Sequence, residues 1–133
     1  MQLYTEYEKL EGNEDGLILL DGQLFTGISK RFYKGFPLSE FTYKKGKRNG
    51  LGRGWYVDTD ALQFEYNYQN GTLHGSCREW YEMGQKKSIT FYEMGVTIEK
   101  KVWDQFGQLV KEYHIENDPS MLKTLHQFRQ IYG

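Results

Sequence analysis

The chain has few of the residues on which disulfide networks, long helices and membrane spans depend. Its 133 residues include one cysteine, Cys77, two prolines and a single alanine, Ala61. One thiol excludes an internal disulfide framework and a zinc cluster held by thiolates. The longest apolar run covers only residues 17–20, whereas a membrane-spanning helix needs roughly 18 or more apolar residues. The N-terminus has neither the basic region nor the apolar core of a signal peptide, so we expect a cytoplasmic protein.

Sequence signatures of catalysis are also missing. The chain has no phosphate-binding loop, no dinucleotide-binding fingerprint and no nucleophile elbow. Its three histidines, His74, His114 and His126, lack the short spacings typical of metal ligands. We expect His74 in a turn and Cys77 as a buried, inert thiol. The sequence therefore predicts no enzyme, no metal and no cofactor.

Glycine and aromatic residues are abundant instead. There are 15 glycines, 11 tyrosines, 8 phenylalanines and 3 tryptophans. Aromatic side chains favour strands, and glycine accepts the positive φ angles of tight turns. This composition predicts an all-β chain built from many short hairpins.

A repeat of about 24 residues runs through the sequence. Four segments align, and their last residues, Gly27, Gly50, Gly75 and Glu99, are 23, 25 and 24 residues apart. Between them lie similar segments in which a strand leads into a glycine turn, so each unit holds two strands. The residues expected to hold the repeats together are Trp55, Gly71, Gly75, Trp80, Gly84, Gly95 and Trp103. We predict a single repeat domain over residues 1–133, with N-terminal cap strands at 1–19, repeats at 20–117 and a C-terminal helix at 118–133.

The repeat resembles the variants of the MORN repeat found in bacteria. That family's unit runs roughly from an aromatic residue and tyrosine through a glycine turn, leucine and glutamate to Tyr-x-Asn-Gly-Lys-x-x-Gly. Two units match it: Trp55, Tyr56, Leu62, Glu65, Tyr68, Asn70, Gly71, His74 and Gly75, and also Phe32, Tyr33, Leu38, Glu40, Tyr43, Gly46, Lys47 and Gly50. The match weakens toward the end, where Glu99 replaces the closing glycine and Asp118 stands at the last turn glycine. The resemblance implies an elongated single-layer antiparallel meander of tandem β-hairpins.

Both ends of the chain carry elements expected to cap this sheet. Asp118 and Pro119 suit the N-cap and the first position of a helix over residues 119–132. Apolar residues then recur at helical spacing: Met121, Leu122, Leu125, Phe128, Ile131 and Tyr132. The helix is expected to cap the sheet, with partner binding as the alternative. Residues 2–10 alternate like a first strand, and residues 11–16 would form its turn.

Charge is unevenly distributed although the net charge is only −1. Residues 25–54 contain eight bases and one acid, whereas residues 1–24 contain six acids and one base. The near-neutral balance argues against a general nucleic-acid coat. The basic stretch at 30–53, which includes aromatic residues, could still contact single-stranded nucleic acid, anionic lipid or a protein, or form a solvated turn region.

The family resemblance implies a non-enzymatic protein-binding module, because bacterial members are often assigned as antitoxins or immunity proteins. Such a protein would neutralise a toxin or effector by covering its active site. The residues expected to meet this partner are Tyr33, Lys47, Arg48, Tyr56, Asp58 and Tyr81. The alternative is a scaffold or membrane-surface module that binds anionic phospholipid through residues 30–53. Open sheet edges would also permit self-association.

Overall fold

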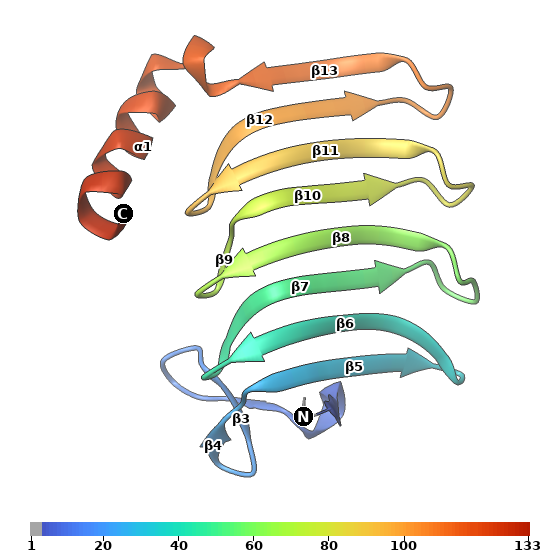
Figure 1. Ribbon diagram of the computed structural model, residues 1–133. Coiled ribbons are helices and arrows are strands. Elements are labelled where there is room, and N and C mark those ends of the chain that lie inside the picture. The colour runs from blue at the N-terminus through green and yellow to red at the C-terminus, as the bar shows by residue number, and fades with distance from the viewer. Residues whose placement is uncertain (1–3) are drawn as a thin grey trace.

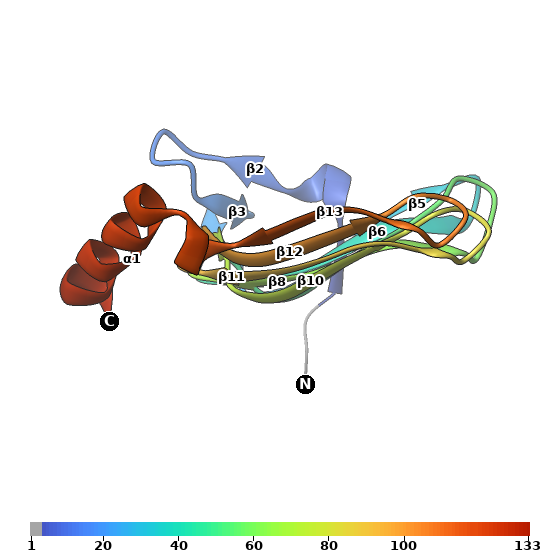
Figure 2. The same cartoon turned by 90° about the horizontal axis from the view of Figure 1, so that it is seen from above.

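The computed structural model describes residues 4–133 and shows one large sheet with a helix at its C-terminal end (Figure 1). Strands make up 56% of the chain, which confirms the predicted all-β fold with a C-terminal helix. The main sheet has ten strands, and from β5 onward strands that follow each other along the chain lie side by side. Seen edge-on, these strands form a single curved layer (Figure 2). No helix within residues 4–133 combines the length and apolarity needed to cross a membrane.

The hairpins follow the repeat predicted from the sequence. The strands of the main sheet are β1 (Tyr4–Glu6), β5 (Gly27–Tyr33), β6 (Phe36–Lys44), β7 (Lys47–Trp55), β8 (Leu62–Gln69), β9 (Thr72–Leu73), β10 (Gly75–Trp80), β11 (Lys86–Glu93), β12 (Val96–Trp103) and β13 (Leu109–His114). The pairing register shifts beside one aromatic residue in each repeat: Phe32, Trp55, Trp80 and Trp103. Such bulges bend a strand and increase its twist, so their recurrence helps to curve the sheet.

The N-terminal segment is not the single strand predicted over residues 2–10. Of residues 4–10, only those of β1 form a strand, and β1 pairs with β5 in parallel. A 3₁₀ turn at Tyr7–Lys9 ends β1, while residues 2 and 3 lie outside the described part of the chain. Sequence alternation could not locate this break, because a short strand and the start of a long one have the same period.

The residues after the 3₁₀ turn form a small sheet of their own. Its strands are β2 (Glu11–Gly12), β3 (Ile18–Leu20) and β4 (Gln23–Leu24). The turn predicted at residues 11–16 is therefore shorter, because its first two residues belong to β2. Asn13 Oδ1 closes it by accepting hydrogen bonds from the backbone N–H groups of Asp15 and Leu17. The small sheet lies to one side of the main layer (Figure 2).

The C-terminal helix, α1 (Pro119–Tyr132), spans the predicted residues. Asp118 caps it by accepting a hydrogen bond from the Met121 N–H at 3.3 Å. A 3₁₀ turn, Ile115–Asn117, connects it to β13. The helix lies beside the turns at one side of the sheet, which we call the helix side (Figure 1). It does not cover the outer edge of β13, which is unpaired in the described part of the chain.

A small apolar core attaches α1 to the sheet. Val96, Ile115 and Leu125 are buried together, and Leu125 is only 2% exposed. Partly buried apolar residues surround them: Met94, Ile98, Tyr113, Met121, Leu122 and Phe128. Arg129 adds an ion pair, donating to the Glu93 carboxylate at 2.7 and 2.9 Å. This hydrogen-bonded pairing lowers the pKa of Glu93, so it favours the charged carboxylate.

The three turns on the helix side share one geometry. They occupy residues 45–46, 70–71 and 94–95, and both residues of each have positive φ. Two successive positive φ angles are typical of type I′ turns, which match the twist of a hairpin. In each turn the glycine N–H donates to a carbonyl oxygen of the preceding repeat. These bonds join Gly46 to Phe25, Gly71 to Arg48 and Gly95 to Leu73, each at 2.8 Å.

A second hydrogen bond reinforces each docked turn. The N–H of the first turn residue donates to a side chain just before the closing glycine of the preceding repeat. The pairs are Lys45 with Thr26 Oγ1, Asn70 with Asn49 Oδ1 and Met94 with His74 Nδ1, at 2.9, 3.1 and 3.1 Å. The predicted turn residue His74 therefore connects two successive repeats through an unprotonated ring nitrogen.

Replacing His74 with leucine is expected to destabilise the protein by about 1 kcal/mol, because the partly buried Met94 N–H loses its acceptor. His74→Asn should retain most of the stability, since Asn49 fills the same role one repeat earlier. Urea unfolding of both variants measures the difference. His126→Leu is the control, because His126 is exposed on α1. Equal stability of the leucine and asparagine variants at position 74 would contradict the assigned role.

One face of the main sheet carries a row of alternating charges. Residues directly opposite each other on successive strands are Lys30, Glu40, Arg53, Glu65 and Arg78. Arg53 Nη2 lies 2.6 Å from Glu40 Oε1. Opposite charges that face each other across strands contribute about 0.2–1 kcal/mol per pair. We call these five residues the charged row.

On the other face, an aromatic layer made of Phe41, Phe64, Tyr66 and Tyr68 lies over the region of β6, β7 and β8. The rings of Phe64 and Tyr66 stack with centroids 4.6 Å apart. Phe41 lies 6.1 Å from the rings of both Phe64 and Tyr68. The rings cover buried glycines of β7. The aromatic layer thus shields the backbone where the single sheet has no second layer.

Candidate functional site

Two of the turns on the side away from α1, which we call the far side, are held in place by tyrosines. The far-side turns follow β5, β7, β10 and β12 (Figure 1). The Tyr56 hydroxyl donates to the Trp80 carbonyl oxygen at 2.7 Å, and the Tyr81 hydroxyl to that of Trp103 at 2.9 Å. Each tyrosine thus ties its own turn to the next repeat. Tyr56 and Tyr81 were predicted to bind a partner; their hydroxyls are engaged within the fold, and both side chains are half-buried.

An exposed apolar side chain also lies in or directly beside every far-side turn. These are Phe36, Val57, Met83 and Phe106, which are 52%, 54%, 86% and 88% exposed. We call these four residues the apolar turn row. Backbone hydrogen bonds close the turns that carry Met83 and Phe106, so the turns hold these side chains outward. An exposed apolar side chain recurs at each of these neighbouring turns, which makes this side a candidate surface for interaction with other molecules.

Two further predicted residues lie on the same side. Tyr33 ends β5 and is 42% exposed, and Asp58 is exposed in the turn after β7. The structure therefore brings Tyr33, Tyr56, Asp58 and Tyr81 to the far side, next to the apolar turn row. That they contact a partner remains a prediction.

Lys47 and Arg48 lie at the opposite end of the strands. Lys47 is exposed where β7 begins, on the helix side. The guanidinium of Arg48 lies 3.8 Å from the centroid of the Phe41 ring, and its Nη1 donates to the Tyr68 hydroxyl at 3.3 Å. Arg48 is therefore packed on the aromatic layer. The structure does not bring these two residues together with the other four.

The basic stretch at residues 30–53 is distributed over several parts of the surface. Lys30 and Arg53 belong to the charged row, and Lys34 lies in a far-side turn. Three lysines, Lys44, Lys45 and Lys47, remain together around the first helix-side turn. The cluster that is continuous in sequence is therefore not one continuous patch in space.

Both acidic and basic side chains lie beside the apolar turn row. Asp58, Asp60 and Glu82 are exposed and form no ion pair with any described residue. The nearby lysines lie over aromatic rings of the protein itself. The Lys86 ammonium is 4.5 Å from the Trp103 ring centroid, and the Lys87 ammonium is 5.7 Å from that of Tyr81. A basic partner surface would complement the three carboxylates of Asp58, Asp60 and Glu82.

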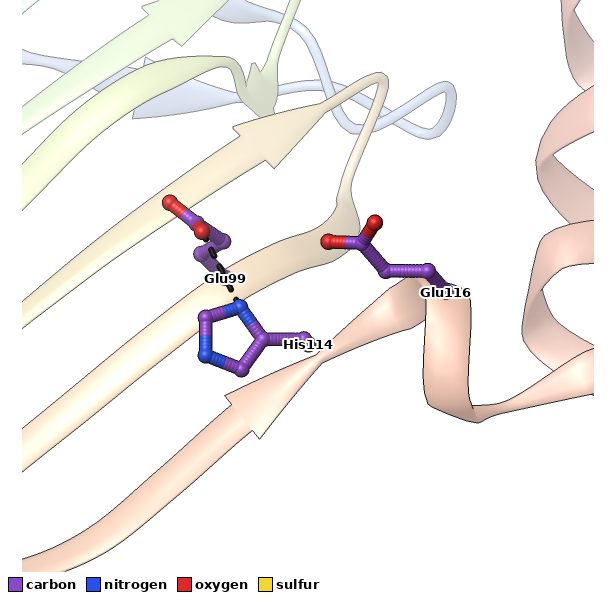
Figure 3. A group of neighbouring side chains, drawn as sticks. All are labelled: Glu99, His114 and Glu116. Atoms are coloured by element: carbon purple, nitrogen blue, oxygen red, sulfur yellow. Dashed lines mark hydrogen bonds and ion pairs between the residues drawn. The ribbon is translucent and has the colours of Figure 1, made fainter.

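A cluster of metal-ligating residues lies elsewhere, at the C-terminal end of the sheet. It consists of Glu99 from β12, His114 from β13 and Glu116 from the following 3₁₀ turn (Figure 3). One ligand atom from each residue lies within 4.8 Å of the others. His114 Nδ1 is 3.0 Å from Glu99 Oε1. The Glu116 carboxylate points toward this pair (Figure 3).

The His114 ring is held from both sides. Its Nε2 lies 2.9 Å from Glu112 Oε1, opposite the contact with Glu99. The hydrogen bond to Glu112, together with that to Glu99, raises the pKa of His114 above its ordinary value. The same bond lowers the pKa of Glu112. Glu112 also lies 3.9 Å from the Lys101 ammonium.

Sequence reasoning missed this cluster because its members are distant along the chain. Glu99 and His114 are 15 residues apart, yet they are direct partners in the β12–β13 pairing. The available signal was the break in the repeat at Glu99. At this position the earlier units have glycine, and Glu99 instead carries a side chain that can reach His114.

Comparison of the chain with protein-family models, curated proteins and solved structures gave no match.

Proposed function

We propose that the chain is a bacterial-type MORN-repeat protein that acts as an immunity protein or antitoxin in the cytoplasm. It would be a non-enzymatic module that neutralises a toxin or effector by covering it. The observation that carries the proposal is the apolar turn row, which exposes one apolar side chain at each far-side turn. The hairpin architecture agrees with the fold that the sequence resemblance implies.

The geometry supports binding by a preformed surface. The turns are fixed by hydrogen bonds within and between repeats, so little conformational entropy is lost when a partner docks. Met83 and Phe106, the most exposed members of the row, are the proposed anchors. The unpaired carboxylates of Asp58 and Glu82 would select a partner whose apolar pocket has a basic rim.

The test is co-expression with a toxin encoded beside the protein. The wild-type chain is expected to bind the toxin and restore growth. The double variant Met83→Ser/Phe106→Ser should bind at least about tenfold more weakly and fail to restore growth, because each anchor contributes about 1 kcal/mol or more. Ile131→Ser is the matched control, since Ile131 is 68% exposed but lies on α1. Circular dichroism checks that all variants fold.

The proposal is wrong if the wild-type chain neither binds the toxin nor rescues growth. It is also wrong in its surface assignment if the double variant and Ile131→Ser behave alike. Flotation with anionic vesicles examines the membrane-surface alternative. Recovery of the chain with such vesicles, lost on charge reversal of Lys44, Lys45 and Lys47, would replace toxin binding as the proposed function.

A further inference from the structure

We propose that Glu99, His114 and Glu116 form a binding site for a divalent transition-metal cation such as Zn²⁺ at the C-terminal end of the sheet. The site combines one imidazole nitrogen with two carboxylate oxygens, a donor set suited to Zn²⁺ and Co²⁺. It is separate from the apolar turn row, because it lies on the helix-side half of β12 and β13 (Figures 1 and 3).

The backbone places the three ligands on one side of the sheet. Glu99 and His114 are cross-strand partners, so their side chains leave the same face. The 3₁₀ turn begins at the next residue, Ile115, whose side chain is buried in the core beneath α1. This anchoring fixes the turn that presents Glu116. The two glutamates therefore approach His114 from rigid elements.

The spacing suits a small ion. A tetrahedral zinc ion with ligands at roughly 2.0–2.1 Å holds neighbouring ligand atoms about 3.3 Å apart. His114 Nδ1 and Glu99 Oε1 are 3.0 Å apart, close to that spacing. Glu116 is exposed and has no hydrogen bond or ion pair with the described residues, so its side chain is free to adjust. Three protein ligands leave a fourth position for water.

Glu112 provides an independent reason to assign a ligand role to His114. It binds Nε2, on the opposite side of the ring from Glu99 and Glu116. Metal-ligating histidines commonly use a carboxylate in this way, because it fixes the ring orientation and the tautomer. Here the fixed orientation directs Nδ1 toward the two other carboxylates. Glu112 is thus a positioning residue for the proposed site.

The local charge also favours a dication. Three carboxylates, Glu99, Glu112 and Glu116, surround the ring. Apart from His114 itself, Lys101 is the one basic residue in the described part of the chain that pairs with any of them, and it pairs with Glu112. A divalent cation would neutralise the remaining negative charge. It would also join β12, β13 and the turn leading into α1. Binding to the native state alone would therefore stabilise this end of the sheet.

Isothermal titration of the purified full chain with ZnCl₂ tests the site, with Co²⁺ absorption as a second readout. We expect one Zn²⁺ per chain and a rise in Tm that excess chelator reverses. Glu116→Gln should weaken Zn²⁺ binding at least tenfold, and it leaves the fold intact because Glu116 is exposed. His114→Ala should abolish binding. Glu112→Gln should weaken it by about tenfold while keeping one ion per chain.

His126→Ala and Glu82→Gln are the controls, because both residues are exposed and distant from the cluster along the chain. Both should bind Zn²⁺ as the wild type does. The proposal is overturned if the wild-type chain binds no Zn²⁺, or if His126→Ala weakens binding as much as His114→Ala. Unchanged affinity in Glu116→Gln would show an adventitious ion only. The titration uses the free chain, so its result does not depend on toxin binding.

Discussion

Leu125→Ala is expected to destabilise the protein by about 2–5 kcal/mol. Leu125 is 2% exposed and lies at the centre of the cluster that attaches α1 to Val96 and Ile115. Truncation leaves a cavity that neither β12 nor the 3₁₀ turn can fill, because both are held by backbone hydrogen bonds. Urea unfolding followed by circular dichroism and tryptophan fluorescence measures the effect.

The two signals report on different ends of the strands. The three tryptophans, Trp55, Trp80 and Trp103, lie next to the far-side turns, whereas the helical signal comes from α1. Ile131→Ala is the control, because Ile131 is 68% exposed on the same helix. It should change stability by less than about 0.5 kcal/mol. The role assigned to Leu125 fails if the two alanine variants unfold at the same urea concentration in both signals.

Gly54→Ala is expected to cost about 1–3 kcal/mol, although alanine normally stabilises a strand relative to glycine. A Cβ atom at Gly54 would clash with the edge of the Phe64 ring. The ring cannot move away freely, because it stacks on Tyr66 and lies beside Phe41. The clash therefore disturbs the aromatic layer. Thermal and urea unfolding measure the loss.

Gly12→Ala provides the matched control for this prediction. Gly12 lies in β2, and no atom lies within 4 Å of a Cβ added there. This substitution should be neutral or slightly stabilising, because alanine restricts the unfolded chain. If Gly54→Ala is as stable as Gly12→Ala, the aromatic layer is loose enough to accept a methyl group, and the packing argument is wrong.

The features that were predicted correctly depend on neighbouring residues in the sequence. The helix over 119–132 follows from Asp118, Pro119 and the 3.6-residue apolar period. The type I′ turns follow from a glycine at the second turn position. Capping, periodicity and turn geometry are local properties, so one sequence is enough to locate them.

The features that were missed depend on contacts between strands. The basic residue Arg48 looked available for a partner, but Phe41 and Tyr68 lie next to it only after β6, β7 and β8 have paired. The Glu99–His114 contact likewise requires the β12–β13 register. Met83 and Phe106 stand before turn glycines in the sequence. The residues next to them in the sequence do not distinguish a side chain that covers a neighbouring strand from one that points into solvent.

The hydrogen bonds that dock each helix-side turn join the same positions in every repeat, which makes the repeats interchangeable units. Removing residues 51–75 would join Gly50 to Ser76 and bring Asn49 to the position of His74. The Met94 N–H would then meet Asn49 Oδ1, and the Gly95 N–H would meet the Arg48 carbonyl oxygen, as Asn70 and Gly71 do now. Each unit spans two strands, or about 10 Å. Adding or removing one repeat unit would therefore lengthen or shorten the far-side surface by about 10 Å. Each such change would add or remove one exposed apolar side chain, while the docking hydrogen bonds between repeats stay the same.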